Sequence, residues 1–471
     1  MTAPRKRLSA PPPAIGPRVR ELRERFHGEV VLPGDRDYDT LRRVWNPGVD
    51  RLPLAVARCT STADVVAAIG FARDAGVAVS VRGGGHSYPG FAVWDDALMV
   101  DLSLLKRLTI EPASRRAIAQ PGLIWGELDA AAQAFGLATT GADIPSVGIA
   151  GMTLGGGLGW LHRMHGLTCD NLVSAEVVLA DGRVVRAAED ENADLFWGLR
   201  GGGGNLGVVT SFEYELHPVT QILGGILVHR LEHTVDALHA YRDVCRDAPD
   251  ELRLSAILVT CPRARSIPQE LHGRPVLFLA CAYFGAHAEG ERLLRPLREF
   301  GAPVLDRIRP IRYVDLQHPA TPEELHHHSK GELLRILDDR TIEAVVAAVA
   351  DATAAFTIVL ISQLGGAMSR VPADATCYPH RHAEHTFGIH SMWDPSGDGE
   401  RHVEWVEAVW RSALHVSAGG PYVNQLGFEG ERRIRAAYGA TYERLASVKA
   451  KYDPDNVFRI NQNVEPRRGS S

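Results

Sequence analysis

The segment Val81-Arg-Gly-Gly-Gly-His-Ser-Tyr-Pro-Gly90 places three consecutive glycines directly before a histidine. A backbone without Cβ atoms can approach a phosphate closely, and its successive N–H groups can form a concave site for an anion. Phosphate-binding loops normally continue into Lys, Ser or Thr. His86 at this position therefore indicates chemistry on the bound ligand itself. The alternative for this segment alone is a glycine-rich surface turn with a solvated histidine.

Two further glycine-rich segments follow. Residues 146–160 are small and apolar and carry no charge, which fits a buried loop lying along a large flat ligand. Residues 200–210 contain a formal G-x-G-x-x-G pattern. A Rossmann motif must follow a strand and open a helix, whereas this one opens into the alternating, β-branched pattern of residues 208–216. The pattern is therefore weak evidence for a Rossmann fold.

In this order the three segments resemble the FAD-binding domain of the vanillyl-alcohol-oxidase superfamily, and most closely its berberine bridge enzyme-like branch. The segment Lys451-Tyr-Asp-Pro-Asp-Asn-Val-Phe-Arg-Ile-Asn-Gln-Asn-Val-Glu-Pro466 resembles that branch's closing signature. The resemblance runs from about Phe26 to Pro466. It implies an α+β fold, with a two-lobed FAD-binding domain and a substrate domain whose antiparallel sheet is backed by helices.

The resemblance also implies how FAD is held. His86 should carry it through an 8α-histidyl bond, noncovalent binding being the alternative. A second, cysteinyl link is not expected, because Ile144 stands where the branch has its cysteine, and Cys169 is better explained as small core packing. The other residues expected to contact FAD are Arg82, Gly83, Gly84, Gly85, Ser87, Gly90, Pro121, Gly122, Gly141, Val147, Gly148, Gly151, Gly155, Gly156, Gly157, Gly159, Asp170, Asn171, Gly207, Val209, Asn461 and Asn463.

Hydrophobic periodicity and turn residues predict two kinds of region. The first has short elements: a helix over 61–76, strands over 77–81 and 98–102, a helix over 126–135, and a hairpin of 172–179 with 183–187. The second has longer strands, over 224–230, 253–260, 275–283 and 357–364, with helices over 235–245, capped by Thr234, and 288–300.

We therefore expect two domains, as the length of 471 residues also suggests. The expected boundaries are a disordered lead over 1–25, an FAD domain formed by 26–218 and 422–466, a substrate domain over 219–421, and a tail over 467–471.

The resemblance implies a small-molecule substrate and O2 as partners, and composition argues against two other kinds of partner. The net charge of −6 argues against a general nucleic-acid binder, and no apolar run approaches the roughly 20 residues of a membrane span. The N-terminus lacks the apolar region of a signal peptide, so we expect a cytoplasmic protein. The scattered cysteines suggest neither zinc nor disulfides. The run His326-His-His328 is interpreted as solvated on a loop or helix, and no metal site is expected.

The substrate side departs from the family pattern. Tyr88 matches a retained active-site tyrosine, and Val147 matches a position that controls oxygen access, where valine accompanies oxidases. Other family positions have changed, to Leu158, Ser362, Thr386 and Gln425. A glutamine cannot act as a general base at neutral pH.

We expect the substrate site between the flavin and the substrate-domain sheet, lined by Tyr88, Gln425, His390 and Asn424. His390 shares strand parity with Thr386, and histidine has a pKa in the range of a general base, near 6–7 if about unperturbed. Its alternative is a structural strand histidine. A neutral amine substrate would need no strong base. The pair His380-Arg381 either binds substrate or pairs across the domain interface.

The sequence thus predicts an FAD oxidase that transfers hydride from a C–H next to O or N of a small cyclic substrate to flavin N5. O2 would be the acceptor and H2O2 the product, in secondary metabolism or catabolism. With a single expected attachment, the chain resembles the mono-covalent subgroup typified by 6-hydroxy-D-nicotine oxidase. An amine is therefore a possible substrate, beside a sugar or an alcohol. The alternatives are a dehydrogenase with another acceptor, a flavin-bearing cyclase or isomerase, and a redox-inactive scaffold.

Overall fold

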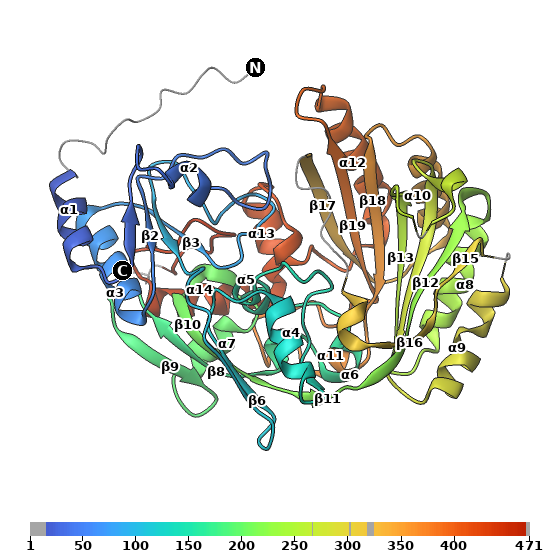
Figure 1. Cartoon of the computed structure of the whole chain (residues 1–471), viewed down its shortest axis with the longest axis horizontal. Coiled ribbons are helices and arrows are strands. Elements are labelled where there is room, and N and C mark those ends of the chain that lie inside the picture. The colour runs from blue at the N-terminus through green and yellow to red at the C-terminus, as the bar shows by residue number, and fades with distance from the viewer. Residues whose placement is uncertain (1–15, 266, 301–302, 318–324, 468–471) are drawn as a thin grey trace.

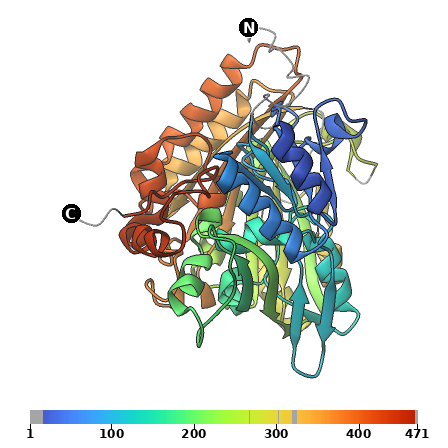
Figure 2. The same ribbon diagram turned by 90° about the vertical axis from the view of Figure 1, so that its left-hand side faces the viewer.

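The computed structural model describes residues 16–265, 267–300, 303–317 and 325–467, and it shows two lobes (Figure 1). The first lobe contains three small sheets, and the second is built on one eight-stranded sheet. Helices α1 (Gly16–Arg25) and α14 (Tyr442–Tyr452) lie near opposite ends of the described chain, yet both belong to the first lobe, which faces the viewer in Figure 2. The chain therefore enters and leaves through the same lobe.

The first small sheet has the strand order β1-β2-β4-β3, and β2 and β3 both run parallel to β4. Helix α3 lies between β2 and β3 in the chain; Ser61 and Asp64 form a capping box at its start, and Gly76 ends it at φ 65°. Strand β3 then delivers the chain directly into the first glycine segment. The bounds are β1 (Glu29–Val31), β2 (Ala55–Arg58), α3 (Thr62–Ala75), β3 (Val79–Arg82) and β4 (Leu98–Asp101).

The second small sheet is antiparallel, with the order β5-β6-β10-β8-β9. Strand β10 follows the third glycine segment, so that segment opens a strand, as expected, and not a Rossmann helix. The strands are β5 (Leu108–Glu111), β6 (Arg116–Ala119), β8 (Leu172–Val178), β9 (Val184–Ala188) and β10 (Val208–Glu215), and β7 (Leu137–Ala138) pairs with β11 (His217–Pro218). The helices are α2 (Tyr38–Leu41), α4 (Trp125–Gln133), α5 (Ile149–Leu154), α6 (His162–His165) and α7 (Ala193–Leu199).

The second lobe's sheet has the order β15-β12-β14-β13-β18-β19-β17, with β16 also paired to β12. Four helices, α8, α9, α10 and α12, cover one face and share its apolar core, while the other face is turned toward the first lobe (Figure 1). The strands are β12 (Gln221–Arg230), β13 (Leu252–Thr260), β14 (Pro275–Tyr283), β15 (Leu305–Asp306), β16 (Arg309–Arg312), β17 (His326–Leu334), β18 (Phe356–Gln363) and β19 (His385–Trp393). The helices are α8 (Thr234–Arg246), α9 (His287–Glu299), α10 (Asp339–Ala350), α11 (Ala367–Arg370) and α12 (Glu400–Ser412).

After α12 the chain returns to the first lobe through a short 3-10 turn (Val423–Gln425), α13 (Glu431–Tyr438) and α14. Strand pairing does not test the domain boundaries after residues 218 and 421, which stay predictions. Within the described part of the chain, no helix combines the length and the apolar content needed to cross a membrane.

The structure resolves the two alternatives for His380-Arg381 in favour of pairing inside the protein. The Arg381 guanidinium donates to both carboxylate oxygens of Asp170, at 2.6 and 2.7 Å, and both side chains are buried. His380 Nε2 lies 3.0 Å from the Ala436 carbonyl oxygen. These contacts join the segment before β19 to the loop after α6 and to α13.

Three expectations need correction. Residues 16–25 were expected to be disordered but form α1, because Val19 and Leu22 lie one helical turn apart and are buried; residues 1–15 and 468–471 lie outside the described residues. Thr234 is the first residue of α8, and His233 occupies the cap position. The run 326–328 opens strand β17 and is half-buried, so it is neither a loop nor a helix.

Candidate active site

The first glycine segment presents free backbone N–H groups. Across the described residues, the N–H groups of residues 84–87 have no acceptor within the protein. The segment is held instead by its carbonyls: the Trp45 N–H donates to the Gly85 oxygen at 3.1 Å, and the Asn46 amide donates to the Tyr88 oxygen at 2.9 Å. A row of unpaired amides fixed in this way suits an anionic or carbonyl-rich ligand such as the FAD pyrophosphate.

The second glycine segment is in direct backbone contact with the first. A Cβ added to Gly84 would lie 2.5 Å from both the N and the Cα of Gly148, so neither position has room for a side chain. Val147, next to this contact, is half-buried, and its carbonyl accepts a hydrogen bond from the Trp125 N–H at 2.9 Å. The two loops are therefore fixed relative to each other wherever they could contact FAD.

The glycines expected to contact FAD fall into two groups. At Gly151 an added Cβ would meet nothing within 4 Å, so this position is open toward a ligand. At the positions of the larger group, an added Cβ would collide with protein atoms, such as the Asn424 amide at Gly155 and the Tyr378 ring at Gly156. Protein atoms also crowd an added Cβ at Gly83, Gly90, Gly122, Gly141, Gly157, Gly159 and Gly207. In the second group, glycine serves close packing of the loops.

Several other residues expected to contact FAD have their side chains engaged in the protein. Asp170 is paired with Arg381, and the Asn171 amide donates to the carbonyls of His165 (2.9 Å) and Leu167 (2.8 Å). The C-terminal segment is tied similarly: the Asn461 amide donates to the Gly204 oxygen at 2.9 Å, and the Asn463 side-chain oxygen accepts from Lys449 at 3.2 Å. Arg82 donates to the Leu41 carbonyl at 2.7 Å, and Val209 is buried in β10. Their FAD contacts stay predictions.

His86 is neutral, and its ring is held in place by stacking. Its ring stacks on Trp45, with ring centroids 5.1 Å apart and an interplanar angle of 23°. Burial lowers its pKa to about 4, so at neutral pH a ring nitrogen keeps its lone pair. A bond from the imidazole to a flavin carbon needs that lone pair.

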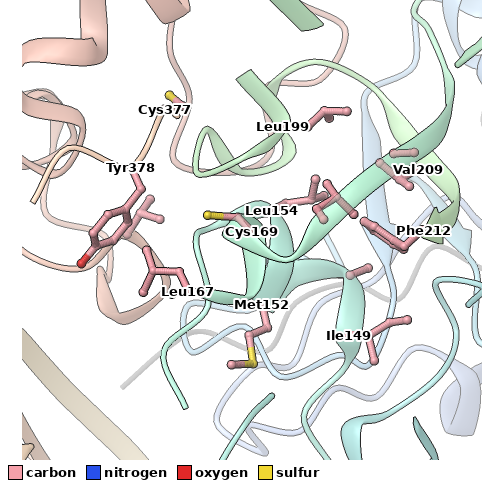
Figure 3. Close-up of a cluster of buried hydrophobic side chains, with 14 of the residues drawn as sticks. Ile149, Met152, Leu154, Leu167, Cys169, Leu199, Val209, Phe212, Cys377 and Tyr378 are labelled. Carbon is pink, nitrogen blue, oxygen red and sulfur yellow. The ribbon is translucent and has the colours of Figure 1, made fainter. Parts of the chain in front are cut away.

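Cys169 is unsuited to a second link. It lies within the apolar cluster that also contains Leu154 and Leu167 (Figure 3). Burial raises the pKa of its thiol above the usual range, so at neutral pH it is protonated, whereas the thiolate is the reactive form. The expectation that Cys169 is a core residue is confirmed.

Strand register brings two histidines together beside Tyr88. His390 lies opposite Ser329 in the β17–β19 pairing, so His327, two residues earlier, is its diagonal neighbour on the same face. His327 Nε2 and His390 Nδ1 are 3.2 Å apart, and one ring donates its N–H to the other. The Tyr88 ring centroid lies 5.0 Å from that of His327 and 5.5 Å from that of His390.

These three groups are uncharged at neutral pH. Burial lowers the pKa of His390 to about 4 and that of His327 well below its usual value, with a further lowering from its two histidine neighbours. Burial raises the pKa of Tyr88 to about 12. A pKa near 6–7 was expected for His390 only if the ring is unperturbed, and that condition is not met, because His390 is only 8 % exposed.

Gln425 lies beside His390, whereas the Asn424 side chain is bonded elsewhere. Gly331 and Gly388 face each other across β17 and β19, and a Cβ on either would approach the Gln425 side chain, at 2.8 Å for Gly331 and 3.5 Å for Gly388. The Gln425 side-chain oxygen is buried, and it has no hydrogen-bond partner among the described residues. The Asn424 amide donates instead to the Gly151 oxygen (3.2 Å) and the Tyr422 hydroxyl (2.8 Å), which ties the return segment to α5.

Sequence reasoning missed Trp45 and His327. Trp45 lies in no recognisable motif, and it contacts His86, Tyr88 and His327 only through the fold. The histidine run of 326–328 concealed a strand, in which alternate residues face opposite sides. Attention to that alternation would have separated His327 from its two neighbours.

The fold and the site define an FAD-linked oxidoreductase, and comparison with known proteins agrees. The "FAD binding domain" family matches residues 53–188, and the "Berberine and berberine like" family matches residues 421–465. (R)-6-hydroxynicotine oxidase from Paenarthrobacter nicotinovorans is 30% identical over 94% of this chain and 97% of its own. Glucooligosaccharide oxidase from Sarocladium strictum is 29% identical over 94% of this chain and 92% of its own.

Solved structures show the same fold. The crystal structure of 6-hydroxy-D-nicotine oxidase from Arthrobacter nicotinovorans matches with a TM-score of 0.84 and 28% identity, covering 94% of this chain and 98% of that chain. The BBE-like 1 protein of Physcomitrella patens matches in fold, with a TM-score of 0.85 and 24% identity, covering 96% of this chain and all of that chain. The chain belongs to the berberine bridge enzyme-like family of FAD-linked oxidoreductases.

The contact between the glycine loops can be tested through cofactor content. We predict that Gly84→Ala lowers the FAD bound per protein, because the new methyl group must push the Gly148 backbone away. The measurement is the ratio of flavin to protein absorbance after purification. Gly70→Ala in α3, where an added Cβ meets nothing within 4 Å, is the matched control and should keep its full FAD content. Full FAD content in Gly84→Ala would contradict the prediction.

Proposed function

We propose that the protein is an FAD-dependent oxidase that acts on a C–H bond next to an oxygen or nitrogen of a small neutral substrate. The observation that carries the proposal is the uncharged group of Tyr88, His327, His390 and Gln425 beside the His86 loop. The names of its relatives, which include oxidases of a hydroxynicotine and of oligosaccharides, support the acceptor O2.

The overall reaction balances as CH–XH plus O2 giving C=X plus H2O2, where X is O or N. When bound, FAD supplies the two-electron acceptor for the hydride of the C–H bond. The protein must then hold the substrate, keep water away and take the proton from X–H. Gln425 has a free carbonyl oxygen that can accept a hydrogen bond from that X–H group and so orient it.

His390 is the group best placed to take the proton. Its far nitrogen, Nε2, would lie 3.2 Å from a Cβ on Gly388, on the side where the Gln425 amide also lies. If His390 Nδ1–H donates to His327 Nε2, then His390 Nε2 carries a lone pair and can act as a base. In this arrangement His327 would select the tautomer of His390 and act as a positioning residue. Tyr88, whose pKa is raised, stays protonated, so it can form hydrogen bonds but does not take the proton as a phenolate.

The first prediction of this proposal concerns attachment. Covalent FAD through His86 alone should leave acid-precipitated protein yellow, with the flavin on a peptide containing His86 and not on one containing Cys169. His86→Ala should release its FAD on precipitation yet bind it in the native state, because the free amides of residues 84–87 remain. The matched control, His233→Gln at an exposed histidine, should stay yellow. A colourless wild-type precipitate would mean noncovalent FAD.

The second prediction concerns the proton. Flavin reduction under anaerobic conditions, with an amine or alcohol found by bleaching in a substrate panel, should be independent of pH from about 6 to 9. It should fall only as the pH approaches 4, because the neutral form of His390 is the base and its pKa is about 4. His390→Ala should slow reduction on the order of 10²–10⁴-fold.

His327→Gln should move the pH profile, because the tautomer is then no longer selected, whereas Tyr88→Phe should keep the profile. The exposed His233→Ala is the control and should behave as wild type. Unchanged reduction in His390→Ala would show that the substrate gives up hydride without a protein base, as a neutral amine can.

The third prediction concerns oxygen. Val147 lies against the Gly84 loop, where an added Cβ on Gly84 would be 3.6 Å from its carbonyl carbon. Val147→Leu should slow reoxidation of the reduced enzyme by air on the order of tenfold, about 1.4 kcal/mol of barrier, and leave reduction unchanged. Val184→Leu, at an exposed valine of β9, is the matched control. Slow wild-type reoxidation with fast transfer to an artificial acceptor would identify a dehydrogenase, and absence of both bleaching and peroxide would favour a cyclase or isomerase.

A further inference from the structure

Beside His390, the second lobe's sheet carries a strip of apolar side chains turned toward the first lobe. Ile358 lies directly opposite His390 on β18, and Leu360 lies opposite Gly388. The register continues from Leu360 to Ile257 on β13 and from Ile257 to Phe278 on β14. We call Ile358, Leu360, Ile257 and Phe278 the apolar strip.

The apolar strip is half-buried, as are Phe356 and Ile226 on the same face, whereas the rows on its two sides are buried. On one side, Val259 and Val276 pack with Ile267 and Leu271 of the loop between β13 and β14. On the other side, Ser255 and Ser362 are buried and hydrogen-bond each other at 2.9 Å. Among the described residues, Ile257, Phe278 and Ile358 also pack against the cluster of Val259 and Val276, but each member of the strip keeps part of its apolar surface exposed.

The apolar strip offers no polar partners to a ligand. Its four side chains carry no polar atom, and the two nearest serine hydroxyls are engaged with each other. The nearest cation on this face of β13, Arg253, is buried, donates to Asp143 at 2.9 Å and lies over the Trp160 ring. A sugar chain laid along the strip would lose water from its hydroxyls without gaining partners, and a charged group would lose more.

We propose that the apolar strip binds an extended apolar part of the substrate, such as fused rings or an alkyl chain, whose reacting polar end lies at His390 and Gln425. From β19 to β14 there are three strand spacings, which gives a length of about 14 Å. The substrate class is therefore an uncharged amphipathic molecule with a polar group at one end. The proposal rests on the proposed function for the position of the reacting group, and its test does not require turnover.

The experiment titrates the FAD-loaded enzyme with 4-alkylphenols, from 4-methylphenol to 4-octylphenol, and follows the flavin difference spectrum. The dissociation constant should fall about threefold to fourfold with each added methylene, because burying one methylene group contributes about 0.8 kcal/mol to binding. It should level off once the chain is as long as the strip. Cellooligosaccharides should produce no spectral change.

Variants locate the effect. Ile257→Asn should flatten the dependence on chain length and leave the affinity for 4-methylphenol unchanged, because Ile257 lies two strands away from His390. Leu360→Phe fills the strip without adding a polar group, so it should weaken binding of the long phenols alone. The matched control is Ile118→Asn, at an exposed isoleucine of β6, which should bind the series like wild type.

Affinity that is independent of chain length in the wild type, equal flattening in Ile118→Asn, or tighter binding of cellooligosaccharides would each overturn the proposal. Failure of the oxidase proposal has a different signature. If the enzyme binds the phenols with the expected length dependence but forms no peroxide with any substrate, the strip proposal stands and the oxidase proposal fails.

Discussion

The direct backbone contact between Gly84 and Gly148 is the constraint on which the rest of the structure depends. It holds the loop that carries His86 against the loop that carries Val147, and no side chain larger than hydrogen fits at either position. Each loop continues a regular element, β3 on one side and α5 on the other. The free amides, the His86 ring that stacks on Trp45 and the Tyr88 ring all lie on the loop that this contact holds in place.

In the second lobe, the register of the strand pairs determines which side chains lie next to each other at the site. The pairing of β17 with β19 sets His327 beside His390, and the pairing of β19 with β18 sets Ile358 beside the same histidine. Burial keeps both imidazoles neutral, with pKa values below the ordinary range, and keeps the Tyr88 phenol protonated. The site thus combines hydrogen-bonding groups without charge and an apolar surface, a combination that favours neutral substrates.

The sequence predicts those parts of the fold that depend on local pattern. Helix α3 and the hairpin of β8 and β9 lie close to their expected bounds, because caps and turn residues mark them. Tyr88, Gln425 and His390 lie together as expected, since the family resemblance and strand parity both place them there. Trp45 and His327 could not be found this way, because their contacts come from segments far apart in the chain. Likewise, Asn424 bonds to α5, a detail that only the three-dimensional path of the return segment decides.

The buried pair of Arg381 and Asp170 bears on how such enzymes can be recombined. Arg381 lies before β19, in a segment that packs on the core of the first lobe, and Asp170 ends the 3-10 turn after α6, so the pair joins segments 211 residues apart in the chain. A chimera that took only one of them would bury a charge without its counterion, at a cost of about 3–5 kcal/mol. An exchange of chain segments in this protein must therefore keep Arg381 and Asp170 together, even though the two residues lie far apart in the sequence.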